Sequence, residues 1–444
     1  MYKRLYELDS LGTISGSTTN ILVDNPTFVN GLKITIDDLK NYILKDITLI
    51  SPTVFGLDWN ESTDTYVRTG DLIGVALNVS PGATLYNMKG CTLLDSGVVN
   101  YYLYPTNWAY KNDGVTASKL NGDDGQVMVQ IPKFYYKYSY AGNTHSWNIA
   151  TIPTTGYDVH PCFIKDGIEV DFRFAGAYEG VLYDVSGGVY TQGNSTQTKD
   201  WTATTGDKLS SVSGFTAVTN GTRAQFRAIA KNRGTGWRQM DYDLLHAIQV
   251  LYLVEYGSFY SQSVIGAGIS NVTDWAAYNN YYPFAPTGNA NSIGNGTGNN
   301  AGGTTCSGEA TKYIKYRGIE QIFGHVWKWI DGFNSYNNVP WVTNNSNYWA
   351  DDTSTNYISG PTCCASDGYQ STLIPSSRFI LPLTVGSDSS HKITDYYWQT
   401  HDNIWRVFIF GGLASADALD GAFCSILNYA SSYSNSTVCS RLCF

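Results

Sequence analysis

The sequence predicts an α+β fold in which a β-rich part is followed by two helices and then by long loops and short strands. Three observations predict it. From about Ile47 the chain reads as short β-leaning runs between turns. Two neighbouring segments, which begin at Thr222 and Asp241, carry helical apolar periodicity, and Gly/Asn-rich stretches follow them. Strands grouped before helices favour α+β over a βαβ alternation.

The composition excludes several function classes. Of 444 residues 15% are charged and 14% aromatic, and the net charge is −9 without any basic block. A nucleic-acid binder needs a cationic surface, so we expect no nucleic-acid partner. No apolar run approaches the roughly 20 residues of a membrane-spanning helix. The start MYKRLYELDS lacks the apolar core of a signal peptide, so neither membrane insertion nor export is expected.

The first 46 residues differ from the rest. Within them KITIDDLKNYILKD predicts a short helix that Thr35 caps and that carries an apolar stripe of Ile36, Leu39 and Ile43. A helix this short needs a partner for its stripe. We therefore expect residues 1–46 to attach the chain or to drive its oligomerisation.

The region 47–140 is predicted to be β-rich. A hairpin is expected around Asp95–Gly97, and the alternating run Gly125–Tyr140 predicts a strand that bends at Pro132. A further strand is expected in Ile168–Gly180, beyond a domain boundary that we place at 140/141.

Two helices are predicted next. The first begins at Thr222, where Gln225 completes a capping box, and we expect a left-handed cap at Gly234. The second runs from Asp241 to Gly257 and is apolar on most sides, so it should be deeply buried.

No motif for a metal or a cofactor stands out. The Gly/Asn-rich stretch Pro286–Thr305 lacks the GxxxxGK[ST] pattern of a phosphate loop and is predicted to be a plain loop. The six histidines are dispersed, and His246 is expected to be a core residue. The eight cysteines form no CxxC pair and are expected to be free thiols. We predict neither a cofactor nor a metal.

The segment Tyr316–Asn334 contains the internal motif GHVWKW. Trp327 and Trp329 are two residues apart and therefore face the same side of a predicted strand. We interpret them as core residues that hold a scaffold together.

This motif is similar to the G-N-V-W-E-W signature of the formylglycine-generating-enzyme branch of the C-type-lectin fold. Further stretches resemble phage and prophage tail-fibre proteins built on that fold, in matching order from about residue 50 to 444, among them GDDGQVMVQIPKFYYK, AKNRGTGWRQMDYDLLHAIQVLYLVEYG and DYYWQTHDNIWRVFIFGG. The resemblance implies a C-type-lectin-like domain over 141–444, long loops, and a place at the tip of a virion tail fibre. It also implies a homotrimer and contacts with other virion tail proteins.

The C-terminal region 405–444 resembles the variable region of proteins diversified by retroelements. In that process AAC and AAT codons become NNC or NNT, which cannot encode Lys, Glu, Gln, Met or Trp. Residues 407–439 contain none of these five types. A buried, uncharged strand-loop-strand would show the same absence, so this alternative stays open here.

The resemblance implies that this region binds a host cell-surface receptor, either protein or polysaccharide. We expect Trp405, Arg406, Gly411, Gly412, Gly421 and Arg441 to be scaffold, together with Trp327 and Trp329. The predicted contact surface comprises Phe408, Phe410, Leu413, Ser415, Asp417, Leu419, Cys424, Ser425, Asn428, Tyr429, Tyr433, Asn435 and Thr437, with the two phenylalanines at its rim.

The sequence lacks the motifs of two other functional classes. Formylglycine-generating enzymes carry two cysteines four and nine residues beyond a Gly-Gly pair, where this chain has Ala416 and Gly421, so an enzyme and catalytic residues are not expected. Calcium-dependent lectins carry E-P-N or Q-P-D and W-N-D motifs, which are absent here, since Gln399 follows Trp398. A structural virion protein without receptor specificity is the remaining alternative.

Overall fold

A five-stranded antiparallel sheet is the first element of the computed structural model, which describes residues 53–82, 86–194, 196–272, 285–304, 310–386, 392–400 and 402–444. The predicted segment 1–46 and its helix lie outside the described residues. The strand order is β2-β1-β7-β6-β8, with β1 Val54–Asn60, β2 Thr65–Gly70, β6 Tyr135–Ala141, β7 Thr144–Ala150 and β8 Asp158–Val159.

The expected boundary at 140/141 is not a boundary of the fold. It falls within the last residues of β6, which pairs with β7 along its whole length, and one compact unit spans Thr53–Phe444. Hydrogen bonding between the two strands joins the regions 47–140 and 141–444, which the local composition had suggested were separate.

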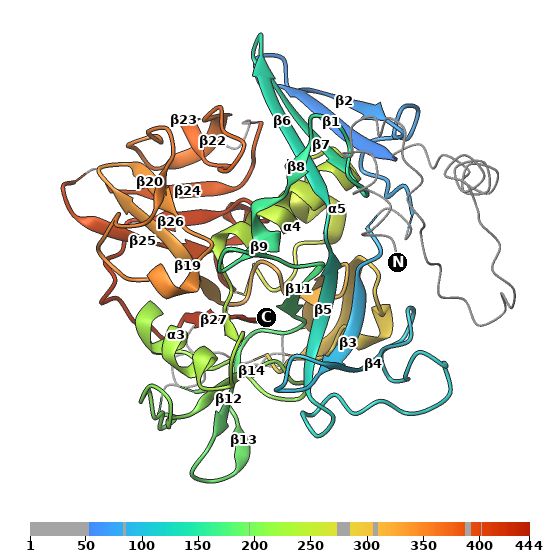
Figure 1. Cartoon of the computed structure of the whole chain (residues 1–444), viewed down its shortest axis with the longest axis vertical. Helices are drawn as coiled ribbons and strands as arrows, with labels where there is room; N and C mark the ends of the chain where they lie inside the picture. The colour runs from blue at the N-terminus through green and yellow to red at the C-terminus, as the bar shows by residue number, and fades with distance from the viewer. Residues whose placement is uncertain are drawn as a thin grey trace, which may run out of the picture. The chain divides into compact units, whose positions relative to one another are not determined.

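A six-stranded sheet brings the end of the chain to its first half (Figure 1). In it Cys443 lies opposite both Ala175 and Arg238. The predicted hairpin is present as β3 and β4, and the predicted strand breaks at Pro132, so that β5 and β6 belong to different sheets. The order is β15-β28-β11-β5-β3-β4, with β3 Lys89–Leu93, β4 Val99–Tyr102, β5 Gln126–Pro132, β11 Phe172–Gly176, β15 Arg238–Gln239 and β28 Leu442–Cys443.

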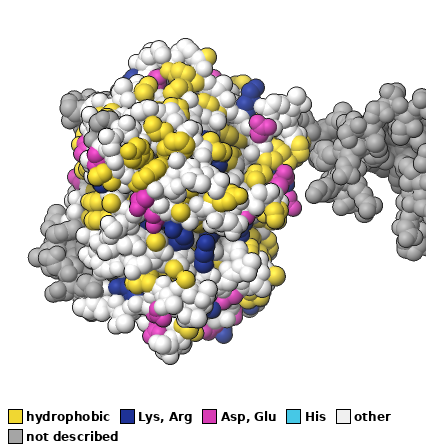
Figure 2. All heavy atoms as spheres, turned by 60° about the vertical axis from the view of Figure 1, so that its left-hand side comes forward, with side chains coloured by type: hydrophobic (Ala, Val, Ile, Leu, Met, Phe, Trp, Pro, Cys, Tyr) yellow, Lys and Arg dark blue, Asp and Glu magenta, His cyan; other side chains and the backbone are white. Residues whose placement is uncertain are grey.

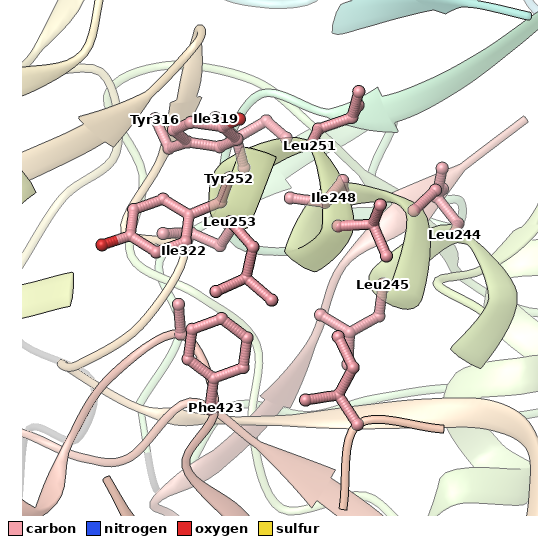
Figure 3. Close-up of a cluster of buried hydrophobic side chains, with 14 of the residues drawn as sticks. Leu244, Leu245, Ile248, Leu251, Tyr252, Leu253, Tyr316, Ile319, Ile322 and Phe423 are labelled. Carbon is pink, nitrogen blue, oxygen red and sulfur yellow. The ribbon is translucent and has the colours of Figure 1, made fainter. Parts of the chain in front are cut away.

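Helix α4 (Tyr242–Tyr256) lies in the centre of the core. Its ends are those predicted, because the Asp241 side chain accepts the N–H of Leu244 and Gly257 adopts a left-handed φ of 63°. All fifteen residues of the helix are buried. Figure 3 shows its leucines packed with Tyr316, Ile319, Ile322 and Phe423, which come from distant parts of the chain.

The other two described α-helices are shorter. In α3 (Arg223–Lys231) the predicted capping box is present, but the helix ends before Gly234. Beyond Lys231 the backbone forms a tighter turn, in which the N–H of Arg233 donates to the Ala230 carbonyl at 3.3 Å and the N–H of Gly234 donates to the Lys231 carbonyl at 3.1 Å. Helix α5 spans Ser261–Ile265.

The largest sheet carries the C-terminal region. Its order is β21-β20-β19-β25-β26-β24-β22-β23, and β27 pairs with β19 in parallel. The bounds are β19 Trp327–Tyr336, β20 Val339–Val342, β21 Ile358–Ser359, β22 Gly368–Leu373, β23 Pro382–Gly386, β24 Tyr396–Gln399, β25 Trp405–Phe410, β26 Ser425–Leu427 and β27 Val438–Ser440.

Short strands and turns complete the fold. We predicted a plain loop for Pro286–Thr305, but part of this stretch forms the strand β16 (Gly298–Thr304). Its backbone pairs with β17 (Ala310–Tyr316), and this pairing overrides the loop-like composition. The small sheets are formed by β9 Ile164–Lys165 and β10 Ile168–Glu169; by β12 Val181–Asp184, β13 Val189–Thr191 and β14 Lys208–Ser210; and by β16 Gly298–Thr304, β17 Ala310–Tyr316 and β18 Ile319–Glu320. Single 3₁₀ turns are η1 Pro161–Phe163, η3 Asn291–Ile293, η4 Ser346–Tyr348 and η5 Asp417–Leu419.

The described part of the chain is therefore β-rich with few helices, and it is consistent with a lectin-like β fold (Figure 1). It is more strongly β than the predicted α+β class, because α3, α4 and α5 form no helical layer of their own. Within the residues that the structure describes, we find no helix of the length and apolarity that crossing a membrane requires.

Candidate functional site

Strand β19 forms the base of the candidate site. Trp329 lies opposite Ile409 of β25 on one side and beside Ser440 of β27 on the other. Its ring is fully buried, and its Nε1 donates to the Gly221 carbonyl at 3.0 Å. Strands β25 and β27 of the C-terminal region are thus both hydrogen-bonded to the same buried strand.

Three glycines shape the first loop of this region. Gly411 and Gly412 have φ values of 97° and 87°, which side chains rarely adopt. A Cβ at Gly412 would lie 1.6 Å from an oxygen of Asp420, and one at Gly421 would lie 2.1 Å from the carboxyl of Asp395. The backbone can approach these two buried carboxyls only where no side chain intervenes.

The loop 413–420 has a hydrogen-bonded backbone, and six of its eight side chains are at least partly exposed. The Asp420 carboxyl accepts the Leu413 N–H at 3.1 Å, and Gln262 Nε2 donates to the carbonyls of Asp417 and Asp420 at 2.7 and 2.8 Å. The Asp417 N–H in turn donates to the Ser270 carbonyl at 2.8 Å. The exposed or half-exposed side chains of this loop are Leu413, Ser415, Ala416, Asp417, Ala418 and Leu419.

The second loop, 428–437, is held at both ends. Arg406 Nη1 donates to the Asn428 carbonyl at 2.9 Å, and Asn220 N–H donates to the Asn435 carbonyl at 3.0 Å. Between these points the rings of Tyr429 and Tyr433 stack at 3.7 Å, and Tyr433 meets Trp329 edge to face at 6.2 Å. None of the ten side chains from 428 to 437 is buried.

The two loops are nearly free of charge. Asp417 is the only Asp, Glu, Lys, Arg or His side chain that they expose, since the carboxyl of Asp420 is buried. Burial raises the pKa of Asp420 and of Asp395 well above the ordinary value of an aspartate. The cause is that burial removes water from the charged form of each carboxyl and so disfavours it.

Four of the residues predicted to lie on the contact surface are buried, so that part of the prediction is wrong. Phe408 and Phe410 are each 2% exposed and belong to the cluster around α4. Cys424 and Ser425 lie where β26 begins, between β25 and β24. The physical reason is the same for all four: both faces of these central strands are covered.

The other predicted surface residues are partly or fully exposed; they are Leu413, Ser415, Asp417, Leu419, Asn428, Tyr429, Tyr433, Asn435 and Thr437. Most of the predicted scaffold is buried, namely Trp327, Trp329, Gly411, Gly412, Gly421 and Arg441, whereas Trp405 and Arg406 are half-exposed. Arg441 donates to the carbonyls of Gly176, Glu320 and Gln321 at 2.7 to 3.0 Å, which ties the last residues of the chain to its centre.

Sequence reasoning missed a row of aromatic residues beside the loops. Tyr369 of β22 meets Tyr396 of β24 at 5.2 Å, Tyr396 meets Trp398 at 4.5 Å, and Trp398 meets Trp327 at 5.5 Å. All but Trp327 are half-exposed. Trp398 packs on the same buried cluster as Leu413, Tyr429 and Tyr433. The alternation in DYYWQ was the signal that could have identified this outward face.

A polar cluster lies buried near the start of β19. Glu179 accepts from His325 at 2.6 Å and pairs with Lys328 at 3.0 Å. Burial alone would raise the pKa of Glu179, but the charges of His325 and Lys328 outweigh it and lower this pKa to about 2. Since all three side chains are at most 3% exposed, we assign the cluster to the scaffold.

Neither the described cysteines nor the other potential ligands gather into a metal site. Seven cysteines are free, and Cys306 lies outside the described residues. Across the described ranges, no three side chains of His, Cys, Asp or Glu are arranged to hold a metal ion. His246 shares a 2.9 Å hydrogen bond with His160 in the core, as expected for a buried histidine.

Comparison with known proteins gives distant matches only. No protein-family model matches the chain, and no curated protein matches it. Among solved structures it is similar to the Major Tropism Determinant U1 variant and M1 variant, each at 14% identity and a TM-score of 0.28. The match covers 86% of this chain and 74% and 76% of theirs. At this distance, function must be argued from the residues of the chain itself.

Proposed function

We propose that the chain is the receptor-binding protein of a phage tail fibre and that loops 413–420 and 428–437 recognise a ligand on the host surface. The observation that carries the proposal is the contrast between the loops' backbone and their side chains. The backbone is held by hydrogen bonds to the side chains of Asp420, Gln262 and Arg406, while most of the side chains between these points reach solvent.

This arrangement suits a surface whose residues can change. Substitutions at exposed positions usually alter stability by no more than about 0.5 kcal/mol, so new side chains here leave the fold intact. The stacked pair Tyr429 and Tyr433 supplies rigid aromatic area, and the serines around it supply short hydrogen-bonding groups. Antibody paratopes combine the same two kinds of residue.

The composition of the two loops supports diversification by a retroelement. Burial accounts for the lack of Lys, Glu and Gln in β25 and β26, because charged and amide side chains are rarely buried. It does not account for their absence from 413–420 and 428–437, where most side chains reach solvent. Adenine-directed codon change would produce this absence in the exposed loops as well as in the strands.

Several further parts of the proposal rest on the resemblance to tail-fibre proteins. In it the chain is a homotrimer on the virion, residues 1–46 contact other tail proteins, and the chain is not an enzyme. The receptor is either a protein or a polysaccharide. The exposed loops carry little charge, which favours contact through aromatic and hydroxyl groups over ion pairing.

A pair of libraries tests the proposal. One randomises Ser415, Asp417, Tyr429 and Ser432 in the loops, and the control randomises exposed residues elsewhere, such as Ile73, Val115 and Ile168. Both are displayed on particles and selected for adsorption to host cells. Selection that enriches loop sequences and leaves the control library unchanged supports the proposal. Equal enrichment in the two libraries, or adsorption that changes with neither of them, favours a structural virion protein.

A genomic observation tests diversification separately. We expect a near-copy of the DNA for residues 405–444 beside a reverse transcriptase gene, with adenines at the positions that differ. If neither is present, diversification is rejected, while receptor binding remains to be judged by the libraries.

A further inference from the structure

A second concave site lies on the strands β12, β13 and β14, outside the C-terminal region. It is a pocket of about 750 Å³ bounded by the β12–β13 hairpin, the turn between β3 and β4, and the loop 121–126. None of its lining residues belongs to 405–444. Any ligand of this pocket would therefore contact residues that diversification leaves unchanged.

Three aromatic rings form one wall of the pocket. Tyr183 meets Tyr190 at 5.0 Å, and Tyr190 meets Phe215 at 5.6 Å. Each ring is half-exposed, so part of its apolar surface is open to a ligand. The loop 121–126 lies directly against this wall, since a Cβ on Gly122 would be only 2.3 Å from the Tyr190 hydroxyl.

Buried polar groups hold the floor in place. Gln126 is 2% exposed; its Oε1 accepts the Ser211 N–H at 2.8 Å. Arg233 is 6% exposed and donates to the Asp95 carboxylate at 2.8 Å. A site whose floor is already hydrogen-bonded needs little rearrangement when a ligand enters.

The charges that line the pocket cancel. Asp95 and Asp123 oppose Lys208 and Arg233, and the Lys208 ammonium lies 3.9 Å from Asp95. A lining without net charge is complementary neither to an anion such as phosphate nor to a polycation. The carboxylates, the exposed Asn121 amide and the ammonium of Lys208 instead offer both acceptors and donors to uncharged hydroxyl groups.

We propose that this pocket binds a neutral oligosaccharide. A sugar ring has an apolar C–H face, which the rings of Tyr183, Tyr190 and Phe215 can cover, and a rim of hydroxyl groups that the polar lining can pair. The site goes beyond the proposed function, because it gives the chain a second, sequence-constant contact. Two weak contacts on one fibre combine into avidity.

The experiment uses the full-length chain and defined sugars. The protein is applied to immobilised maltoheptaose, chitopentaose and mannopentaose as neutral probes and to oligogalacturonate as the acidic probe. The affinity for each probe that binds is then measured by calorimetry. Phe215→Leu removes one ring and Lys208→Gln removes the charge at the rim. Val185→Ala is the matched control, because Val185 is exposed on the same hairpin but does not line the pocket.

We expect a neutral probe to bind and its affinity to fall about tenfold in Phe215→Leu, which corresponds to the loss of one aromatic contact. Binding should fall in Lys208→Gln and stay unchanged in Val185→Ala and in the loop variant Ser432→Ala. Thermal unfolding of each variant verifies that it is folded. Failure to bind all three neutral probes, preference for the acidic probe, or weakening by Ser432→Ala instead of the pocket variants would overturn the proposal. These results do not depend on the outcome of the loop libraries.

Discussion

Replacing Trp329 tests whether the buried sheet holds the two loops. The side chain is 0% exposed, donates one hydrogen bond to the Gly221 carbonyl at 3.0 Å and touches Tyr433. Trp329→Ala removes a buried aromatic, which costs about 3–5 kcal/mol. It also leaves a buried carbonyl unpaired, at about 1–3 kcal/mol. Because the two terms overlap, we expect a total loss of about 4–6 kcal/mol.

A second substitution separates the two terms. Trp329→Phe keeps most of the apolar contact but removes the N–H, so it should cost about 1–3 kcal/mol, mainly from the Gly221 carbonyl. Ser432→Ala is the control, since Ser432 is exposed and should change stability by no more than about 0.5 kcal/mol.

Urea unfolding followed by far-ultraviolet circular dichroism measures all three variants. The expected order of stability loss is Trp329→Ala, then Trp329→Phe, then Ser432→Ala. If Trp329→Ala unfolds at the same urea concentration as Ser432→Ala, the reasoning that places the support of the loops in β19 is refuted.

Three other predictions concern the loops and the assembly. Alanine replacement of Tyr429 and Tyr433, singly and together, should reveal a coupling of about 0.5–1.5 kcal/mol in unfolding, because their rings stack at 3.7 Å. Burial raises the pKa of the Asp420 carboxyl. Above the ordinary aspartate pKa of about 4, the unfolded chain releases this proton while the folded chain keeps it. The free energy of unfolding should therefore fall as the pH rises from about 4 through the raised pKa. Asp420→Asn should remove that part of the fall while keeping an acceptor for the Leu413 N–H, as urea unfolding at several pH values would show. Light scattering should report a trimer for the full chain and a monomer for a chain that begins at Ile47.

Each of these has a result that contradicts it. Additive losses for the two tyrosines would mean that the stack contributes nothing to the fold. A pH dependence identical in Asp420→Asn and the unaltered chain would mean that this carboxyl does not titrate with folding. A monomeric full-length chain would reject the trimer, whereas a trimer that survives the truncation would place the interface outside residues 1–46.

Local sequence determined the elements whose stability is set within one turn of the chain. Asp241 and Gly257 mark the ends of α4 because a cap and a left-handed glycine act on neighbouring backbone groups. The capping box of Thr222 and Gln225 likewise places the start of α3. The spacing of Trp327 and Trp329 indicated a buried strand face for the same reason, since alternation is a property of the strand itself.

Only the tertiary structure decided which faces of the strands meet solvent. Alternation separates Phe408 and Phe410 from Val407 and Ile409, but all four are buried, because α4 covers one face of β25 and a second cluster covers the other. The pocket on β12, β13 and β14 depends even more on the tertiary structure. Its lining residues lie between 94 and 233, and no local pattern in the sequence relates them. Burial depends on what the rest of the chain places against a segment, and that arrangement arises from contacts between residues far apart in sequence.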